Sequence, residues 1–332
     1  MTSRCQNAYL TTLAHNHELV GYYSAFSAAL HTTKKRRPYR DTLLEPLKSY
    51  WKIKSYIYTT EFKATCDKEI KALFNKDMFT YIDESEVLES PLPLPLMWVL
   101  SYKFDEDGYL DRHKARLVAR GDLQVDQDDT YAATLAAQTF RAIMAIVAAF
   151  DLEIKQYDAV NAFANARLPK PLYFLCPEGY KKAGKVLKAT RAIYGLRVSP
   201  LLWYNKLTLS LKKLGMKPVP ETSCLFMNDW LILLFFVDDV IIAYSPRDQD
   251  KMTQFEAKLL ALYEFRVLDD ATHFLGIRII HDRPNRKLWL VQDSYIQKLA
   301  EKFYITVTKT PKTPLLSAEI PDWAAKSAKL EK

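Results

Sequence analysis

Apolar and polar positions follow two periods along this chain, one typical of helices and one typical of strands. From Thr60 to Lys76 the apolar residues recur every three or four positions, which predicts an amphipathic helix with a threonine cap. Residues 97–104 and 109–119 are apolar-rich runs joined by an Asp-Gly turn at 105–108. This arrangement predicts a β-hairpin.

The second half of the chain repeats this mixture of periods. Helices are predicted over 138–150 and 248–263, from a capping Ser199 to Gly215, and from about 293; strands are predicted at 152–158, 224–227 and 230–244, with a further hairpin over 274–281 and 288–291. Together these elements predict an α+β fold, in which an antiparallel sheet carries helices packed on one side.

The most apolar run of the chain contains two adjacent acids, Asp238 and Asp239, where its two predicted strands turn. Unpaired carboxylates are costly in apolar surroundings, and two neighbouring carboxylates repel each other. Such a pair is explained if a multivalent cation neutralises it, or if it lies at an exposed turn. We favour the first explanation and predict a metal-binding hairpin tip.

A third acid fits the same site. Asp158 shares a strand face with Leu152 and Ile154 and lies at the end of that strand. An acid at the end of one strand can meet acids at the tip of a neighbouring hairpin, so three carboxylates are expected at one edge of the sheet. Phosphoryl transfer with two Mg²⁺ ions requires such an arrangement, because Mg²⁺ takes most of its ligands from water and substrate phosphates. An Asp-Asp dipeptide alone usually marks only a turn.

Composition narrows the class of partner. The formal net charge of +8 and the pI of about 9.0 suit a polyanion such as nucleic acid, although charge alone does not establish one. The four cysteines are far apart and form no CxxC pair, so neither a zinc site nor a disulfide framework is expected, and an intracellular compartment is the default. The chain shows no signal peptide and no run of about 20 apolar residues, so no membrane partner is expected.

Residues 1–58 are the least patterned part and are expected to be a basic leader. The cluster Lys34–Arg37 suits nuclear import, phosphate binding or a solvated loop, and His15 and His17 lack the partners of a metal site. The segment Gly179–Val186 fits G-x-x-x-x-G-K, but valine follows the lysine where a phosphate loop needs serine or threonine. A basic hairpin loop is expected there instead.

Six blocks follow one another along the chain: Lys114–Gln124, Gln156–Phe163, Pro177–Tyr180, Tyr194–Pro200, Phe236–Asp239 and Phe274–Ile277. In these blocks the chain resembles the reverse transcriptase of copia-type long-terminal-repeat retrotransposons, over roughly residues 59–310. The resemblance implies a right-hand polymerase fold, with fingers over about 95–135 and 165–193 and a palm over about 136–164 and 194–310. Residues 311–332 would then be a tail that starts a truncated connection.

The resemblance also implies an activity. The chain is expected to be an RNA-directed DNA polymerase that adds deoxynucleotides to a primer 3′-hydroxyl with two Mg²⁺ ions. Asp158, Asp238 and Asp239 would be its catalytic and metal-binding acids. Its partners would be an RNA template, a DNA primer, deoxynucleoside triphosphates and other Gag and Pol products, in cytoplasmic virus-like particles or the nucleus.

Five further residues match positions that bind substrate in this family. Phe163 would lie against the sugar of the incoming nucleotide and exclude a 2′-hydroxyl, the alternative being core packing. Lys114 and Arg116 share a strand face and would grip the triphosphate, the alternative being a solvated face. Gly195 would allow the backbone to approach the template and the incoming base. Arg197 would contact nucleic acid, with an ordinary surface role as the alternative.

Two features depart from the family pattern. Phe236 replaces the tyrosine that usually precedes Val-Asp-Asp, and this change is expected to tune the activity without abolishing it. These 332 residues include no ribonuclease H, protease or integrase. That absence favours the alternative function, a catalytically inactive retrotransposon remnant that at most binds nucleic acid. A two-metal nuclease is a third possibility, which the predicted fingers blocks weaken.

Overall fold

The computed structural model describes residues 37–87, 92–105, 108–124, 130 and 132–304. Within them the chain forms two compact units. Unit 1 takes its residues from Met1–Ala133 and Asn161–Leu209, and unit 2 from Thr134–Val160 and Ser210–Lys332. His15, His17, most of the basic cluster at 34–37 and the predicted tail at 311–332 lie outside the described residues.

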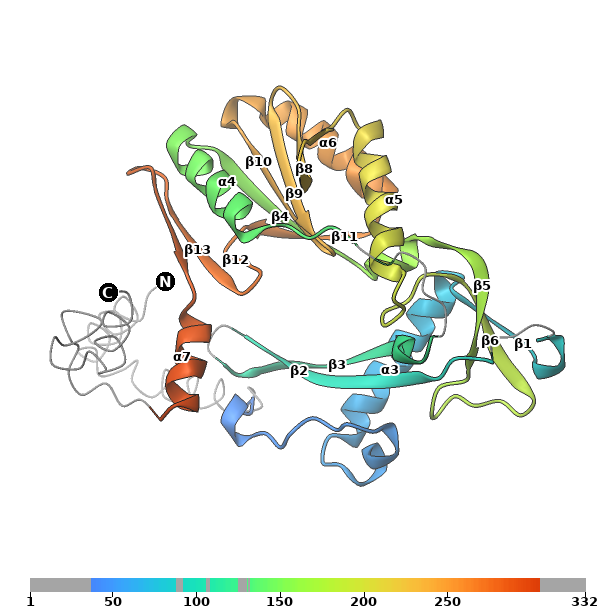
Figure 1. Ribbon diagram of the computed structural model, residues 1–332. Helices are drawn as coiled ribbons and strands as arrows, with labels where there is room; N and C mark the ends of the chain where they lie inside the picture. The colour runs from blue at the N-terminus through green and yellow to red at the C-terminus, as the bar shows by residue number, and fades with distance from the viewer. Residues whose placement is uncertain (1–36, 88–91, 106–107, 125–129, 131, 305–332) are drawn as a thin grey trace, which may run out of the picture. The chain divides into compact units, whose positions relative to one another are not determined.

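Unit 1 contains two antiparallel sheets, one of two strands (β2-β3) and one of three strands in the order β1-β6-β5. Its elements are α3 (Thr59–Asn75), β1 (Phe79–Asp83), β2 (Leu96–Phe104), β3 (Leu110–Ala119), β5 (Arg167–Leu175), β6 (Lys185–Arg191) and the first part of α5 (Ser199–Lys213). The predicted hairpin at 97–119 is confirmed as β2 and β3 (Figure 1). The loop at 179–186 leads into a strand of an antiparallel pair, which is not the helix that a phosphate loop requires.

Helix α3 packs against β3 and forms much of the core of unit 1 (Figure 1). Its predicted apolar face is confirmed, because Phe62, Cys66 and Leu73 are buried. The predicted threonine cap is wrong: the helix begins after Tyr58 without a side-chain cap. Instead, the Thr59 hydroxyl, already inside the first turn, donates to the carbonyls of the preceding residues 53 and 56 at 2.6 and 2.5 Å.

The described end of the leader is built into unit 1. It forms two short 3-10 helices, η1 (Arg40–Thr42) and η2 (Tyr50–Ser55), and Ile53 is only 1% exposed. At the tip of the β2–β3 hairpin the backbone N–H of Arg40 donates to Gly108, and that of Leu110 donates to Pro38. Weak sequence patterning over 37–58 therefore reflects irregular backbone, and not a lack of packing.

Unit 2 is built on a six-stranded antiparallel sheet in the order β11-β4-β10-β9-β8-β7. Figure 1 labels β4 and β8 to β11 of this sheet. Its strands are β4 (Glu153–Ala159), β7 (Lys217–Val219), β8 (Thr222–Met227), β9 (Leu231–Phe236), β10 (Asp239–Tyr244) and β11 (Phe265–Asp270), and its helices are α4 (Ala137–Phe150), the end of α5, α6 (Gln249–Leu262) and α7 (Asp293–Lys302). These bounds confirm all four predicted helices of this half, and Gly215 ends α5 with φ +84°.

Helix α6 contacts one face of this sheet through hydrogen bonds. Glu256 on α6 accepts hydrogen bonds from Tyr157 and Lys155 on β4, at 2.8 and 2.9 Å. Because residues alternate along a strand, Asp158 projects from the opposite face of β4. The acid therefore lies on the sheet face away from α6.

A second sheet of unit 2, in the order β12-β13-β14, corrects one sequence prediction. The run 274–281 was expected to be one strand, but it is broken into β12 (His273–Phe274) and β13 (Ile277–Asp282). Leu275 and Gly276 both have positive φ, 51° and 76°, so the chain reverses there. The hairpin of β13 with β14 (Lys287–Val291) is confirmed. None of the described helices is long and apolar enough to span a membrane.

Candidate active site

The Asp-Asp pair lies where strand β9 turns into strand β10. The turn is one residue earlier than predicted, because β9 ends at Phe236 and Asp239 is already the first residue of β10. Val237 adopts the left-handed conformation with φ +55°, which costs free energy for a β-branched residue. The backbone thus holds Asp238 at the tip of the hairpin and Asp239 within the sheet.

Strand register then brings the third acid beside the pair. Asp239 on β10 lies directly opposite Asp158 on β4, and the N–H of Ala159 donates to the carbonyl of Asp238 at 2.8 Å. The same row continues on both sides, with Phe236 opposite Asp239 and Arg266 on β11 opposite Asp158. Since residues directly opposite in antiparallel strands project from the same face, these four side chains form one line. Together with the adjacent Asp238 at the hairpin tip, they are called the acid row below.

The three carboxylates influence one another's ionisation. The pKa of Asp239 is raised to about 6, mainly by burial and then by the negative charges of Asp238 and Asp158. A hydrogen bond with the Gln156 side chain opposes this shift. The raised pKa therefore reflects burial first and the negative charge of the neighbouring acids second.

The acids provide hard oxygen ligands of the kind that Mg²⁺ prefers, so the donor chemistry fits a divalent cation. Their side chains do not form a ready ligand set: among the described residues, no group of three or more His, Cys, Asp or Glu is arranged to hold a metal ion. One of the three acids, Asp158, is instead bound by Arg266, with 3.0 Å between Nη1 and Oδ2. The backbone therefore brings the three acids together, while the side chains still have to rearrange around a cation.

Arg266 and Gln156 were not predicted from the sequence. Strand β11 went unrecognised because its only signal is a short run after a helix, and without it Arg266 has no assigned neighbour. Gln156 is a buried polar residue two positions before Asp158, and strand alternation alone places both on one face. That alternation was the one available signal.

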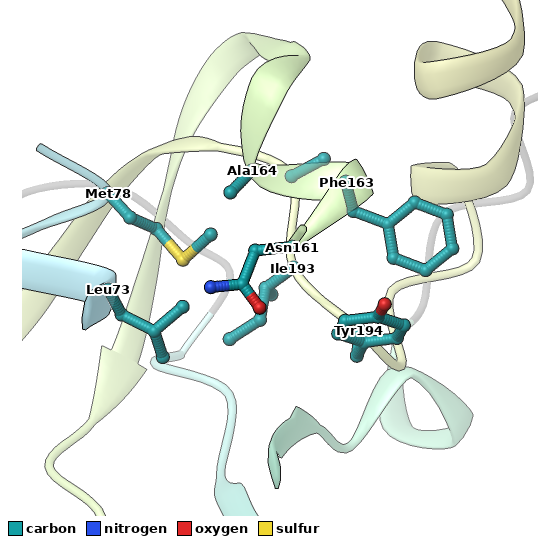
Figure 2. A pocket seen from close by; sticks show the side chains of 8 residues that line it. Leu73, Met78, Asn161, Phe163, Ala164, Ile193 and Tyr194 are labelled. Carbon is teal, nitrogen blue, oxygen red and sulfur yellow. The ribbon is translucent and has the colours of Figure 1, made fainter. Parts of the chain in front are cut away.

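Phe163 lies in unit 1, in the short helix η5 (Ala162–Asn165), and is 7% exposed. Its ring meets that of Tyr194 edge to face, with 4.6 Å between centroids. The two rings lie at one end of a small pocket, and apolar side chains such as Leu73 and Met78 form the other end (Figure 2). The residues that line this pocket are Leu73, Met78, Asn161, Phe163, Ala164, Ala192, Ile193 and Tyr194.

The two predicted phosphate-binding cations lie on strand β3 of the same unit. Lys114 and Arg116 are two residues apart on one face, opposite Ser101 and Val99 of β2, and both are half-buried. The Arg116 guanidinium lies over the ring of Tyr194, 4.9 Å from its centroid. Unit 1 thus joins Arg116, Tyr194 and Phe163 in one contiguous set of contacts.

Gly195 follows in a turn whose backbone is pressed against the end of β3. The N–H of Ala119 donates to the carbonyl of Tyr194 at 2.7 Å, and Gly195 has φ +91°. A Cβ built on Gly195 would overlap the carbonyl oxygen of Ala119. Close backbone approach is therefore needed here for packing within the chain. Arg197 is exposed and donates to Gln124 and to the carbonyl of Asp122.

Comparison with protein families gives a match to residues 84–317, in a family described as "Reverse transcriptase (RNA-dependent DNA polymerase)". The matched range includes the whole acid row and all five predicted substrate-binding residues. It leaves out α3 and β1, which the structure shows to be part of unit 1.

Several curated proteins are similar to the chain. It is 32% identical over 241 residues to the retrovirus-related Pol polyprotein from transposon TNT 1-94 of Nicotiana tabacum, covering 69% of this chain and 18% of that protein. It is 27% identical over 231 residues to the Pol polyprotein from transposon RE2 of Arabidopsis thaliana (67% and 16%). It is also 27% identical over 248 residues to the transposon Ty1-BR Gag-Pol polyprotein of Saccharomyces cerevisiae (70% and 14%). The chain thus spans less than a fifth of the length of these relatives.

Among solved structures, a foamy viral protease-reverse transcriptase dRH in complex with double-stranded DNA matches 64% of this chain and 33% of that chain. The sequence identity is 16% and the TM-score is 0.35. A TM-score of this size is too low to establish a shared fold.

Proposed function

This chain belongs to the reverse transcriptase (RNA-dependent DNA polymerase) family, in the group found in copia-type retrotransposons, and on that premise we propose that it is an RNA-directed DNA polymerase. Its reaction would be attack of a primer 3′-hydroxyl on the α-phosphate of a deoxynucleoside triphosphate, with an RNA strand as template and pyrophosphate as leaving group. The observation that carries the proposal is the acid row. Within the family match, strand register sets Asp158 opposite Asp239, and Asp238 forms the hairpin tip between β9 and β10.

The acids have a defined task in this reaction. Asp158, Asp238 and Asp239 would hold two Mg²⁺ ions, and the family generally uses divalent metal ions. When bound, such ions lower the pKa of the attacking hydroxyl and stabilise the charge on the leaving group. The chain itself supplies three carboxylates fixed by β4 and β10, and it supplies Gln156 to orient Asp239. Neutralisation of the acids would also remove the repulsion that raises the Asp239 pKa.

The two units can be assigned to the palm and the fingers of a right-hand polymerase. We assign unit 2, with the acid row, to the palm, and unit 1 to the fingers. This assignment differs from the resemblance at 161–164 and 194–209, which the resemblance places in the palm and which belong to unit 1. Lys114 and Arg116 would bind the triphosphate from the fingers, where two cations on one face attract a polyanion.

Phe163 is proposed to exclude ribonucleotides by contact with C2′ of the incoming sugar. Its edge-to-face contact with Tyr194 supports this role, because a ring held on one side by another ring has a fixed position. Gly195 would act indirectly, by letting the turn that carries Tyr194 lie against β3. Arg197, which is exposed, would contact the nucleic-acid strand. Gag and Pol products of the same element would be its partners, in virus-like particles or in the nucleus.

Primer extension on an RNA template tests the proposal. The full chain should extend a DNA primer in the presence of Mg²⁺ and deoxynucleoside triphosphates, and Asp238→Asn should reduce the rate by at least about a thousandfold, because the carboxylate contributes chiefly in the transition state. Asp229→Asn is the matched control. Asp229 is an exposed acid at the tip of the β8–β9 hairpin of the same sheet, and its replacement should leave the rate unchanged.

The same experiment distinguishes polymerase activity from the alternative function, which is nucleic-acid binding without catalysis. If the folded wild-type chain extends no primer but binds an RNA–DNA duplex with an affinity that falls as salt rises, the chain is a nucleic-acid-binding protein without polymerase activity. Extension by wild type and by Asp238→Asn at equal rates would instead show that the acid row is not the catalytic site.

A further inference from the structure

Arg266 is the one cation in the acid row. It lies on β11, the edge strand, directly opposite Asp158, and its Nη1 atom is 3.0 Å from Oδ2 of that acid. Its charge therefore lies beside an oxygen that the proposed function assigns to a metal ion. Arg266 lies within the family match, but the comparisons assign it no role.

The ion pair between Arg266 and Asp158 can give way to a bound cation. The Arg266 side chain is 51% exposed and that of Asp158 is 29% exposed, so water screens the pair and its net contribution is small. Because β11 is an edge strand, a long arginine side chain can swing into solvent while the backbone pairing of β11 with β4 stays in place. The guanidinium carries one positive charge, whereas a divalent cation carries two and can bridge several carboxylates.

We propose that Arg266 is an internal counter-ion that holds Asp158 until a divalent cation displaces it, so that Arg266 sets the affinity of the acid row for that cation. This inference rests on the proposed function, because it takes the acid row as the cation site. Arg266 acts through Asp158 and is therefore a positioning residue. Before a cation binds, Arg266 offsets part of the negative charge of the acids, and for the same reason it weakens cation binding.

Replacement of Arg266 by a neutral residue should tighten the binding of a divalent cation. Arg266→Gln removes the competing charge beside Oδ2 of Asp158, so the full chain should bind Mn²⁺ roughly two- to fivefold more tightly, as expected for loss of a half-exposed ion pair. Arg266→Lys keeps the charge and should bind Mn²⁺ like wild type. Binding is measured without nucleotide or nucleic acid, from the loss of the free-ion Mn²⁺ signal in electron paramagnetic resonance.

Arg278→Gln is the matched control. Arg278 forms an ion pair with Asp293 on unit 2, outside the acid row, and its side chain is 44% exposed against 51% for Arg266. Its replacement makes the same change of net charge. It should leave Mn²⁺ affinity unchanged. A melting curve shows that each variant is folded, and the folded Arg266→Lys protein keeps the comparison valid if Arg266→Gln is unstable.

Failure of the counter-ion role and failure of the proposed metal site give different results. If Asp238→Asn weakens Mn²⁺ binding while Arg266→Gln binds like wild type or more weakly, the counter-ion role is overturned and the proposed function stands. If Asp238→Asn binds Mn²⁺ as wild type does, the acid row is not the cation site, and the proposed metal site falls together with the counter-ion role. An equal gain of affinity in Arg266→Gln and Arg278→Gln would also overturn the inference, because net charge alone would explain it.

Discussion

At the scale of single residues, the hairpin tip between β9 and β10 carries the clearest signal of a functional site. Asp238 and Asp239 interrupt an apolar run, and that anomaly alone predicts a charged site. Asp158 was predicted from strand alternation, because an acid at the end of one strand can meet the acids at the tip of a neighbouring hairpin. Arg266 could not be found in this way, because its importance depends on which strands pair and in which register. Alternation places Gln156 on the face of Asp158, but its hydrogen bond with Asp239 depends on the pairing of β4 with β10. Pairing between β4 and β11 is a property of the folded sheet.

Asp239 gives a pH-dependent prediction for the metal-free chain. Its pKa is about 6 in the folded protein against an ordinary value of 3.8, so the folded state holds a proton that the unfolded state releases. The stabilisation from that proton is present below about pH 4 and is lost as the pH rises to about 6. Asp239→Asn removes the ionisable group and should therefore be more stable than wild type above about pH 6.

The expected gain from Asp239→Asn is on the order of 1 kcal/mol, after discounting for the partial exposure of the group. Urea unfolding in EDTA at several pH values measures it as the difference in free energy of unfolding between variant and wild type. The difference should shrink below about pH 4. A variant that is less stable than wild type at neutral pH, or a difference that does not change with pH, would contradict this account of the site.

Phe163 gives a prediction about substrate choice. Phe163→Val should raise the incorporation of ribonucleotides relative to deoxynucleotides by roughly 10- to 100-fold, because a single steric group in a pocket is worth about that much discrimination. Phe163→Tyr keeps the ring and should keep the discrimination. Competition between the two nucleotides in single-nucleotide additions measures the ratio. An unchanged ratio in Phe163→Val would assign Phe163 to core packing beside Tyr194 instead.

At the scale of elements, helices and hairpins followed from the sequence, whereas strand breaks did not. Apolar spacing and the signals at helix ends located α3, α4, α5 and α6 within a few residues. The break between β12 and β13 was missed because Leu275 adopts a positive φ, which nothing in its side chain favours. The turn before Asp239 was misplaced by one residue for the same reason, since Val237 is the residue that bends.

Gly195 gives a prediction about the turn that carries Tyr194. Gly195→Ala should destabilise unit 1 by about 2 to 4 kcal/mol, because φ is +91° and the added Cβ would overlap the Ala119 carbonyl. Gly184→Ala is the control: φ is also positive there, at +66°, but no atom lies within 4 Å of the added Cβ. It should cost only about 1 kcal/mol. Equal losses in denaturant unfolding would show that the contact with β3 is unimportant.

At the scale of the whole molecule, the folded chain is larger than the segment that the family match covers. The match begins at residue 84, but α3 and β1 lie before it and complete unit 1. Phe62 and Cys66 on α3 are both 0% exposed, as is Leu117 on the facing strand. The resemblance placed residue 59 as the start of the domain, and the structure extends the packed region back to the 3-10 helices within 37–58.

A chain that begins at Glu84 tests this extension. It should lose the fold of unit 1, because without α3 one face of β3 loses its apolar cover and the three-stranded sheet loses its edge strand β1. Hydrogen exchange should show fast exchange in β2, β3 and β6 while β4 and β10 of unit 2 stay protected, with the full chain as reference. Slow exchange in β2 and β3 of the shortened chain would contradict the assignment of α3 to the core.

The most direct test of the central claim is to locate divalent ions in the chain. Crystals of the chain with an RNA template, a DNA primer that lacks its 3′-hydroxyl and a deoxynucleoside triphosphate, grown in Mn²⁺, would show the ions by anomalous scattering. The account predicts two peaks, both within bonding distance of carboxylates of Asp158, Asp238 or Asp239, and beside the primer end and the triphosphate. Peaks bound elsewhere on the chain, or a primer end bound away from the acid row, would contradict it.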